Sequence, residues 1–138
     1  FTKNSTEALN IAILGTLKKG DHVVTTCMEH NSVLRPLCFL ENNKIISVSY
    51  AKADKYGFVD INDITDLIKR KTRMIICTFS SNVTGAVQPI KDIGNLDFQT
   101  FINYTELIFL CVDSLSVEFE LPKFESRVQF PVGAFFLN

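Results

Sequence analysis

Stretches with a helical spacing of apolar residues alternate along this chain with short runs of β-branched residues. Residues 5–19 carry apolar side chains at intervals of three and four, and the run His22–Cys27 that follows is rich in valine and threonine. The same succession returns twice, at residues 31–41 and 44–50 and at residues 60–69 and 74–78. This order predicts an α/β fold, in which a mostly parallel sheet is flanked by helices and ligands bind at the carboxyl ends of the strands.

The pattern is weaker after Asp92. The remaining candidates are a weak helix at 100–106, an apolar strand at 107–112, an alternating strand at 117–121 and a last strand at 133–137. No internal repeat, linker or second domain is visible in the sequence. We therefore expect residues 1–138 to belong to a single domain.

Length and charge exclude several classes of protein. A chain of 138 residues suits one domain, and 14 Lys and Arg against 15 Asp and Glu give a net charge of −1. This balance does not favour nucleic acid or an anionic membrane as a partner. The longest apolar run, Leu107–Val112, is much shorter than the roughly 20 residues of a membrane-spanning helix.

The two ends of the sequence are unusual. The chain begins at Phe1 without a Met or the basic and apolar regions of a signal peptide, and it stops at Asn138 directly after an apolar stretch. We expect it to be a piece of a larger, cytoplasmic protein.

The four cysteines fit a reducing compartment. Cys27, Cys38, Cys77 and Cys111 lie far apart, and no two of them form a C-x-x-C pair. With only two histidines in the chain, no spacing typical of a metal site is present. We expect the cysteines to be small core residues, and we predict no metal.

Polar residues at strand ends and helix starts are the candidates for a site. Ser5 and Thr6 open a predicted helix, where free amides favour an anion, although on their position alone a plain N-cap is the better explanation. His30 follows the first strand, where its own turn can satisfy it, and Asn82 lies in a polar loop that turn chemistry alone explains. Asp113 ends an apolar run, where a carboxylate needs a cationic partner unless it caps a helix.

Taken together, four segments resemble the cysteine desulfurases and their class V aminotransferase relatives. Phe1–Asn10 is similar to the family segment F-T-x-G-T-T-E-A-I-N, and Met28–Leu37 contains its E-H-N-S motif. Ser80–Gly85 resembles the S-N-V-x-G loop, and Cys111–Asp113 resembles the V-D strand end. The order and intervals also agree, closely over residues 1–95 and only thinly over residues 96–138.

The resemblance implies part of the large domain of a fold-type I enzyme that uses pyridoxal 5'-phosphate. By this resemblance Ser5 and Thr6 would hold the cofactor phosphate, and His30 would stack on the pyridine ring and move protons as a catalytic residue. Asn82 would bond the phenolic oxygen of the ring, and Asp113 would pair with its protonated nitrogen.

The implied reaction is that of a cysteine desulfurase or selenocysteine lyase, which converts L-cysteine to L-alanine and leaves a persulfide on the enzyme. The implied partners are a sulfur-acceptor protein and a second copy of the intact protein. Two alternatives stay open: a non-catalytic remnant or interaction module of the same fold, and a class V aminotransferase with another substrate.

The sequence also departs from the family pattern. Asn4 stands where the family usually has glycine, and Ser116 stands where it usually has glutamine. Counted without gaps, the lysine that forms the Schiff base would fall just past Asn138, and Lys123 lacks the G-H-K context. We therefore expect the chain to show no turnover by itself.

Overall fold

The computed structural model describes residues 2–94, 108–112, 116–120 and 128–131. Its centre is one six-stranded sheet with the strand order β2-β1-β3-β4-β5-β6. β2, β1, β3 and β4 pair in parallel, whereas β5 and β6 are added as antiparallel strands. The strands are β1 (His22–Thr26), β2 (Ser47–Ala51), β3 (Thr72–Thr78), β4 (Ile108–Val112), β5 (Ser116–Glu120) and β6 (Val128–Pro131).

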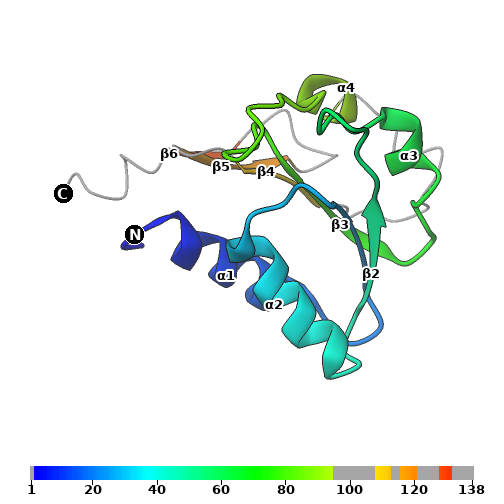
Figure 1. Cartoon of the computed structure of the whole chain (residues 1–138). Coiled ribbons are helices and arrows are strands. Elements are labelled where there is room, and N and C mark those ends of the chain that lie inside the picture. Colours follow the sequence, from blue (N-terminus) through cyan, green and yellow to red (C-terminus); the bar gives the residue numbers. More distant parts are fainter. Residues whose placement is uncertain (1, 95–107, 113–115, 121–127, 132–138) are drawn as a thin grey trace.

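Helices cover both faces of the sheet. They are α1 (Ser5–Thr16), α2 (Asn31–Asn42), α3 (Ile61–Thr65) and α4 (Ile90–Gly94). In Figure 1, α1 and α2 lie side by side on one face, and α3 and α4 lie on the other. The predicted α/β class, with a mostly parallel sheet flanked by helices, is therefore confirmed.

Two hydrophobic clusters, one on each face, hold these layers together. Successive side chains of a strand point to opposite faces, so Val23 of β1 packs in the cluster with α1 and α2, whereas Val24 packs in the cluster with α3 and α4. In β3, Met74 and Ile76 belong to the first cluster, and Ile75 belongs to the second. Burial on both faces explains why residues 74–78 in β3 form a short apolar run.

Element boundaries differ from the predictions where the chain turns. The predicted strand at 44–50 begins only at Ser47, because Lys44 adopts a left-handed φ of 56° that ends the preceding helix. The helix predicted from Asp60 to Lys69 ends at Thr65, and i to i+3 bonds such as Leu67 N to Ile64 O tighten the chain after it. Neither α4 nor β6 is predicted, and the segments expected at 100–106 and 133–137 lie outside the described residues.

The prediction that the cysteines are core residues is wrong for two of them. Cys77 is buried in β3, but Cys27 and Cys38 are exposed. Cys27 directly follows β1, where its sulfur accepts a hydrogen bond from Ala53 N at 3.2 Å, and Cys38 lies on the outer side of α2. Among the described residues no three potential ligands gather to hold a metal ion, and no helix is long and apolar enough to cross a membrane.

Candidate cofactor site

The carboxyl ends of three neighbouring strands meet at one edge of the sheet, which we call the carboxyl edge. β1 ends at Thr26, β3 ends at Thr78 and β4 ends at Val112, which pairs with Thr78. The loop after β1 leads to His30, and the loop after β3 contains Asn82. Asp113 follows the end of β4 in sequence and lies outside the described residues, so its role stays a prediction.

A cavity of about 440 Å³ lies between the starts of α1 and α2. It brings together two predicted site residues, Thr6 and His30, that are far apart in sequence. Ser5 and Asn82 are not among the residues that line it, which are Thr6, Asn10, His30, Asn31, Ser32, Arg35 and Pro36. The cavity thus lies between the helix start that is predicted to bind an anion and the imidazole that is predicted to stack on an aromatic ring.

The start of α1 is capped in a way that leaves two amides available. Asn4 Oδ1 accepts a hydrogen bond from Glu7 N at 2.9 Å, and Glu7 in turn accepts one from Lys3 N at 2.6 Å. Within the described part of the chain, the amides of Ser5 and Thr6 have no acceptor. Asn4 has an extended φ of −165°, which asparagine adopts as readily as glycine, so the departure from the family pattern does not distort the helix start.

His30 caps α2 and exposes the rest of its ring. Its Nδ1 accepts a hydrogen bond from Ser32 N at 3.1 Å and lies 2.9 Å from Ser32 Oγ. The interpretation of His30 as a residue satisfied by its own turn is therefore correct, but it accounts for only one of the two ring nitrogens. An acceptor role for Nδ1 places the proton of a neutral imidazole on Nε2.

Asn82 lies exposed in a tight loop after β3. Ser81 organises this loop, because its hydroxyl oxygen lies 3.3 Å from both Val83 N and Thr84 N and can accept from them. Gly85 has a φ of 74° and donates its amide to Ser81 O at 2.8 Å, which closes the turn. The backbone therefore holds the loop in shape without the Asn82 side chain, which leaves that side chain available to a ligand.

Glu29, which the sequence analysis did not select, is the buried titratable residue of this edge. Its Oε1 accepts hydrogen bonds from Thr26 Oγ1 and from Thr78 N, both at 2.8 Å, and so links β1 to β3. Its Oε2 is buried and has no partner within the described residues. Burial raises the pKa of Glu29 to about 7, although both hydrogen bonds act to lower it. The signal available in the sequence for Glu29 was an acidic residue three positions after a buried strand.

Residues 1–113 match the family model described as aminotransferase class-V. The chain belongs to this family. The resemblance found in the sequence is thereby confirmed, and the cavity lies within the part of this class V chain that matches.

Several curated proteins similar to this chain are cysteine desulfurases. The chain is 39% identical over 100 residues to cysteine desulfurase IscS of Clostridium botulinum, which covers 70% of this chain and 25% of the relative. It is 40% identical over 97 residues to a probable cysteine desulfurase of Methanothermobacter thermautotrophicus, and this match covers 70% of this chain and 24% of that relative. The chain therefore spans about a quarter of the length of the curated relatives it matches.

Solved structures agree with this class V assignment. An apo cysteine desulfurase from Thermococcus onnurineus gives a TM-score of 0.61 at 30% identity, over 67% of this chain and 24% of that one. A NifS-like protein gives a TM-score of 0.70 at 25% identity, over 90% of this chain and 35% of that one.

Proposed function

We propose that this chain is the part of a cysteine desulfurase-like enzyme that holds pyridoxal 5'-phosphate at the carboxyl edge of the sheet. The observation that carries the proposal is the cavity shared by Thr6 and His30. Similarity to several cysteine desulfurases supports this reaction over that of another class V aminotransferase.

The residues around the cavity suit this cofactor. The twelve-residue helix α1 begins with two amides, Ser5 N and Thr6 N, that have no acceptor among the described residues, and its dipole adds a favourable field for a phosphate. The exposed ring of His30 offers an aromatic face, held in place by the hydrogen bond from Ser32 N. A phosphate group and a flat ring are the two recognition elements of the cofactor.

Each residue has a separate task in this proposal. When bound, the cofactor supplies an electron sink that weakens the bonds at Cα of an amino acid. Ser5 and Thr6 hold its phosphate, and His30 packs on its ring and moves a proton at Nε2. Asn82 bonds its phenolic oxygen, and Asp113 pairs with its protonated nitrogen.

The proposed overall reaction converts L-cysteine to L-alanine. The carbon–sulfur bond of the substrate breaks, a sulfur–sulfur bond forms on an enzyme thiol, and a proton from that exchange goes to the carbon. The four matching segments contain neither the lysine that binds the cofactor covalently nor this thiol. We therefore expect the chain to bind the cofactor without turnover, and we expect the intact protein to act as a dimer that passes sulfur to an acceptor protein.

Titration with pyridoxamine phosphate tests the site without the cofactor aldehyde, which reacts with any exposed lysine. We expect His30→Asn to weaken binding about tenfold by isothermal titration calorimetry, because asparagine keeps the N-cap but removes the ring. We expect a similar loss for Thr6→Ala, since a hydrogen bond to a charged group contributes about 1.5–3 kcal/mol. Thr16→Ala, at the other end of the same helix, is the matched control and is expected to bind as the parent chain does.

Two results would contradict the proposal. If the parent chain showed no binding up to millimolar pyridoxamine phosphate, the cavity would not be a cofactor site. If all three variants bound as the parent does, the ligand would lie elsewhere. Release of alanine from cysteine by the chain alone would instead refute the expectation that it has no turnover.

A further inference from the structure

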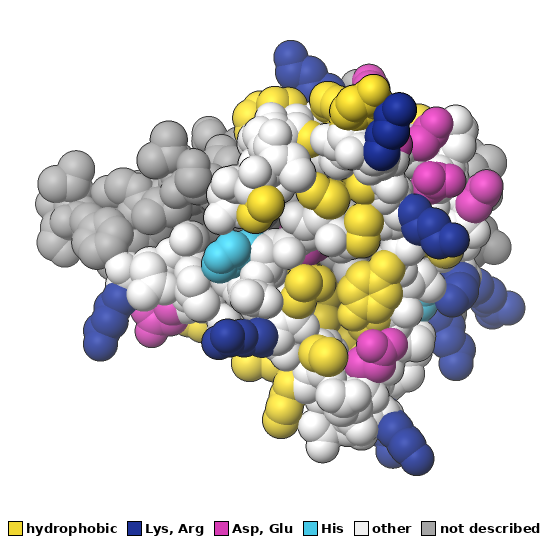
Figure 2. Space-filling model, in the orientation of Figure 1, with side chains coloured by type: hydrophobic (Ala, Val, Ile, Leu, Met, Phe, Trp, Pro, Cys, Tyr) yellow, Lys and Arg dark blue, Asp and Glu magenta, His cyan; other side chains and the backbone are white. Residues whose placement is uncertain are grey.

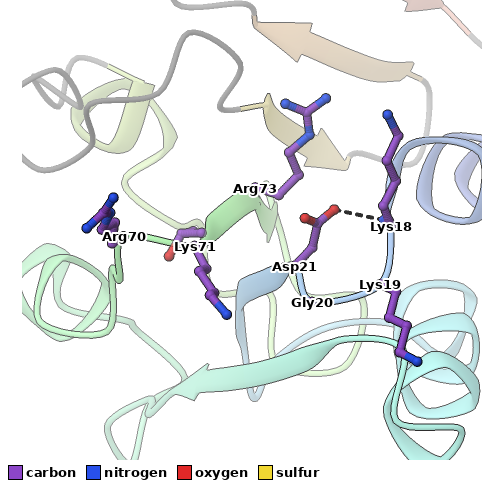
Figure 3. A pocket seen from close by; sticks show the side chains of 8 residues that line it. Lys18, Lys19, Gly20, Asp21, Arg70, Lys71 and Arg73 are labelled. Atoms are coloured by element: carbon purple, nitrogen blue, oxygen red, sulfur yellow. Dashed lines mark hydrogen bonds between the residues drawn. The ribbon is translucent and has the colours of Figure 1, made fainter.

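A second cavity lies at the opposite edge of the sheet, where the parallel strands begin. It measures about 390 Å³ and is formed by the loop between α1 and β1 and by the loop that leads into β3 (Figure 3). Its lining residues are Lys18, Lys19, Gly20, Asp21, Arg70, Lys71, Thr72 and Arg73. We call this place the basic cavity.

Positive charge is concentrated there although the whole chain carries a net charge of −1. Five of the eight lining residues are lysine or arginine, and Asp21 is the one carboxylate among them. Asp21 Oδ2 accepts a hydrogen bond from Lys18 N at 2.8 Å, which holds it against its own loop. The space-filling view shows Lys and Arg side chains gathered at the right, where the loop before β3 lies in Figure 1 (Figure 2).

The cationic side chains are spread out, and four of the five, Lys18, Lys19, Arg70 and Lys71, are exposed. Figure 3 shows Lys18 and Arg73 extending on one side of Asp21, whereas Lys19 and Lys71 extend the other way. Within the described residues, the side chains of these three lysines form no ion pair with a carboxylate. A ligand that satisfies all of them must therefore carry negative charges at several separated points.

Several amides at and beside the basic cavity are not available to a compact anion. The amides of Gly20, Asp21, His22 and Thr72 already donate to carbonyl oxygens within the chain, at 2.8–3.1 Å. Sites that bind phosphate tightly use converging backbone amides in addition to side chains. The long cationic side chains extend away from one another, which favours carboxylates distributed along a peptide over one compact phosphate group.

We propose that the basic cavity docks an acidic segment of a partner protein. Lys18, Lys19, Arg70 and Lys71 supply the attraction, and Asp21 limits how many carboxylates fit between them. A partner docked there leaves the carboxyl edge open, because the two sites lie at opposite ends of the same strands. The proposal does not depend on the cofactor site, since no residue lines both cavities.

Fluorescence anisotropy with a labelled peptide of eight glutamates tests this docking on the 138-residue chain. We expect Lys71→Glu to weaken binding about tenfold at low salt, because it replaces an attraction by a repulsion at close range. Lys91→Glu in α4 makes the same charge change on an exposed residue outside the cavity and is expected to weaken binding less than twofold. Asp21→Asn keeps an acceptor for Lys18 N and is expected to tighten binding about threefold.

Three outcomes would overturn the proposal. Absence of peptide binding below 1 mM at low salt would show that the charges do not form a docking site. Equal effects of Lys71→Glu and Lys91→Glu would show that the peptide is attracted by the overall charge of the chain and not by the basic cavity. Displacement of the peptide by inorganic pyrophosphate at a lower concentration than by unlabelled peptide would assign the cavity to a phosphate ligand instead.

Discussion

In the described part of the chain, each of the two edges of the sheet buries one titratable side chain that links neighbouring strands, and burial shifts the two pKa values in opposite directions. At the carboxyl edge Glu29 joins β1 to β3, and burial raises its pKa to about 7, so that it is mostly protonated below that pH. At the amino edge His22 is 1% exposed and gives its proton up, because burial, and then the charge of Lys69, lowers its pKa to about 4. Between about pH 4 and pH 7 both groups are mostly uncharged, which avoids the cost of burying a charge.

The bonds at the amino edge explain why His22 holds three strands together. Its Nδ1 lies 2.8 Å from Thr72 Oγ1 of β3, and its Nε2 lies 2.9 Å from Ser49 Oγ of β2. Both hydroxyls are satisfied by the neutral ring, and Lys69 Nζ also donates to Ser49 Oγ at 3.1 Å. A proton added to His22 would lie close to that ammonium group without a carboxylate partner among these contacts.

The two shifts have opposite consequences for stability. The folded chain keeps the Glu29 proton up to a higher pH than the unfolded chain, so this contribution is complete below pH 4.5 and is lost as the pH rises through 7. The folded chain resists the His22 proton, so that contribution is complete above pH 6.5 and is lost as the pH falls through 4. Between pH 4.5 and 6.5 a rise in pH lowers stability through Glu29 and raises it through His22. In the parent chain the two changes in the free energy of unfolding therefore largely cancel.

The largest expected effect comes from Glu29→Gln. Glutamine keeps an oxygen for Thr26 Oγ1 and Thr78 N but cannot ionise, so the loss of stability with rising pH disappears. Relative to the parent chain, the free energy of unfolding should improve by about 3 kcal/mol between pH 4 and pH 8, from the shift in pKa. Urea unfolding at each pH measures this difference.

Thr26→Val is the control for this change. It removes one hydrogen bond to Glu29 but leaves the carboxyl group in place, so the decline with rising pH should persist. A difference between Glu29→Gln and the parent chain that stays constant with pH would show that Glu29 does not change its protonation over this range.

His22→Gln should give the opposite trend with a smaller measurable size. Glutamine does not accept a proton, so the variant should gain stability relative to the parent chain as the pH falls. Over the interval from pH 6.5 to 4.5 the gain should be about 2 kcal/mol in the free energy of unfolding. Ser49→Ala keeps the histidine and should keep the parent's pH dependence, and a flat difference for His22→Gln would contradict the low pKa of His22.

The strand-linking role of neither buried group could be predicted from the sequence, because the partners on the neighbouring strands are distant along the chain. Thr78 is 49 positions from Glu29, and Thr72 is 50 positions from His22. The strands themselves were predictable, since His22–Thr26 and the core of β3 carry local β-branched patterns. The five-residue helix α4 was not, because so few residues show little periodicity.

The candidate site likewise has features that local sequence predicts and features that depend on contacts between distant residues. Local signals were enough to predict that Thr6 lies at a helix start and that His30 follows the first strand, because helix starts and strand ends are visible in the sequence. That these two residues share one cavity depends on the packing of α1 against α2, which the sequence does not display. Asn82 was placed correctly in a polar loop, but the sequence did not show that Ser81 holds that loop.

The smallest predicted effect concerns the helix start at the carboxyl edge, and it separates a structural role of Asn4 from a binding role. Asn4→Ala removes the acceptor for Glu7 N and should cost about 1 kcal/mol in the free energy of unfolding, whereas Asn4→Gly should cost only a few tenths.

Asp60→Ala is the control, since Asp60 caps α3 by accepting from Asn62 N at 2.8 Å and does not line the cofactor cavity. We expect Asn4→Ala and Asp60→Ala to lower stability by the same amount in urea unfolding. Only Asn4→Ala should also weaken pyridoxamine phosphate binding, because α1, unlike α3, contributes Thr6 to the lining of that cavity. If both variants weakened binding equally, the amides of α1 would have no special part in holding the phosphate, and the two edges would differ in their buried groups alone.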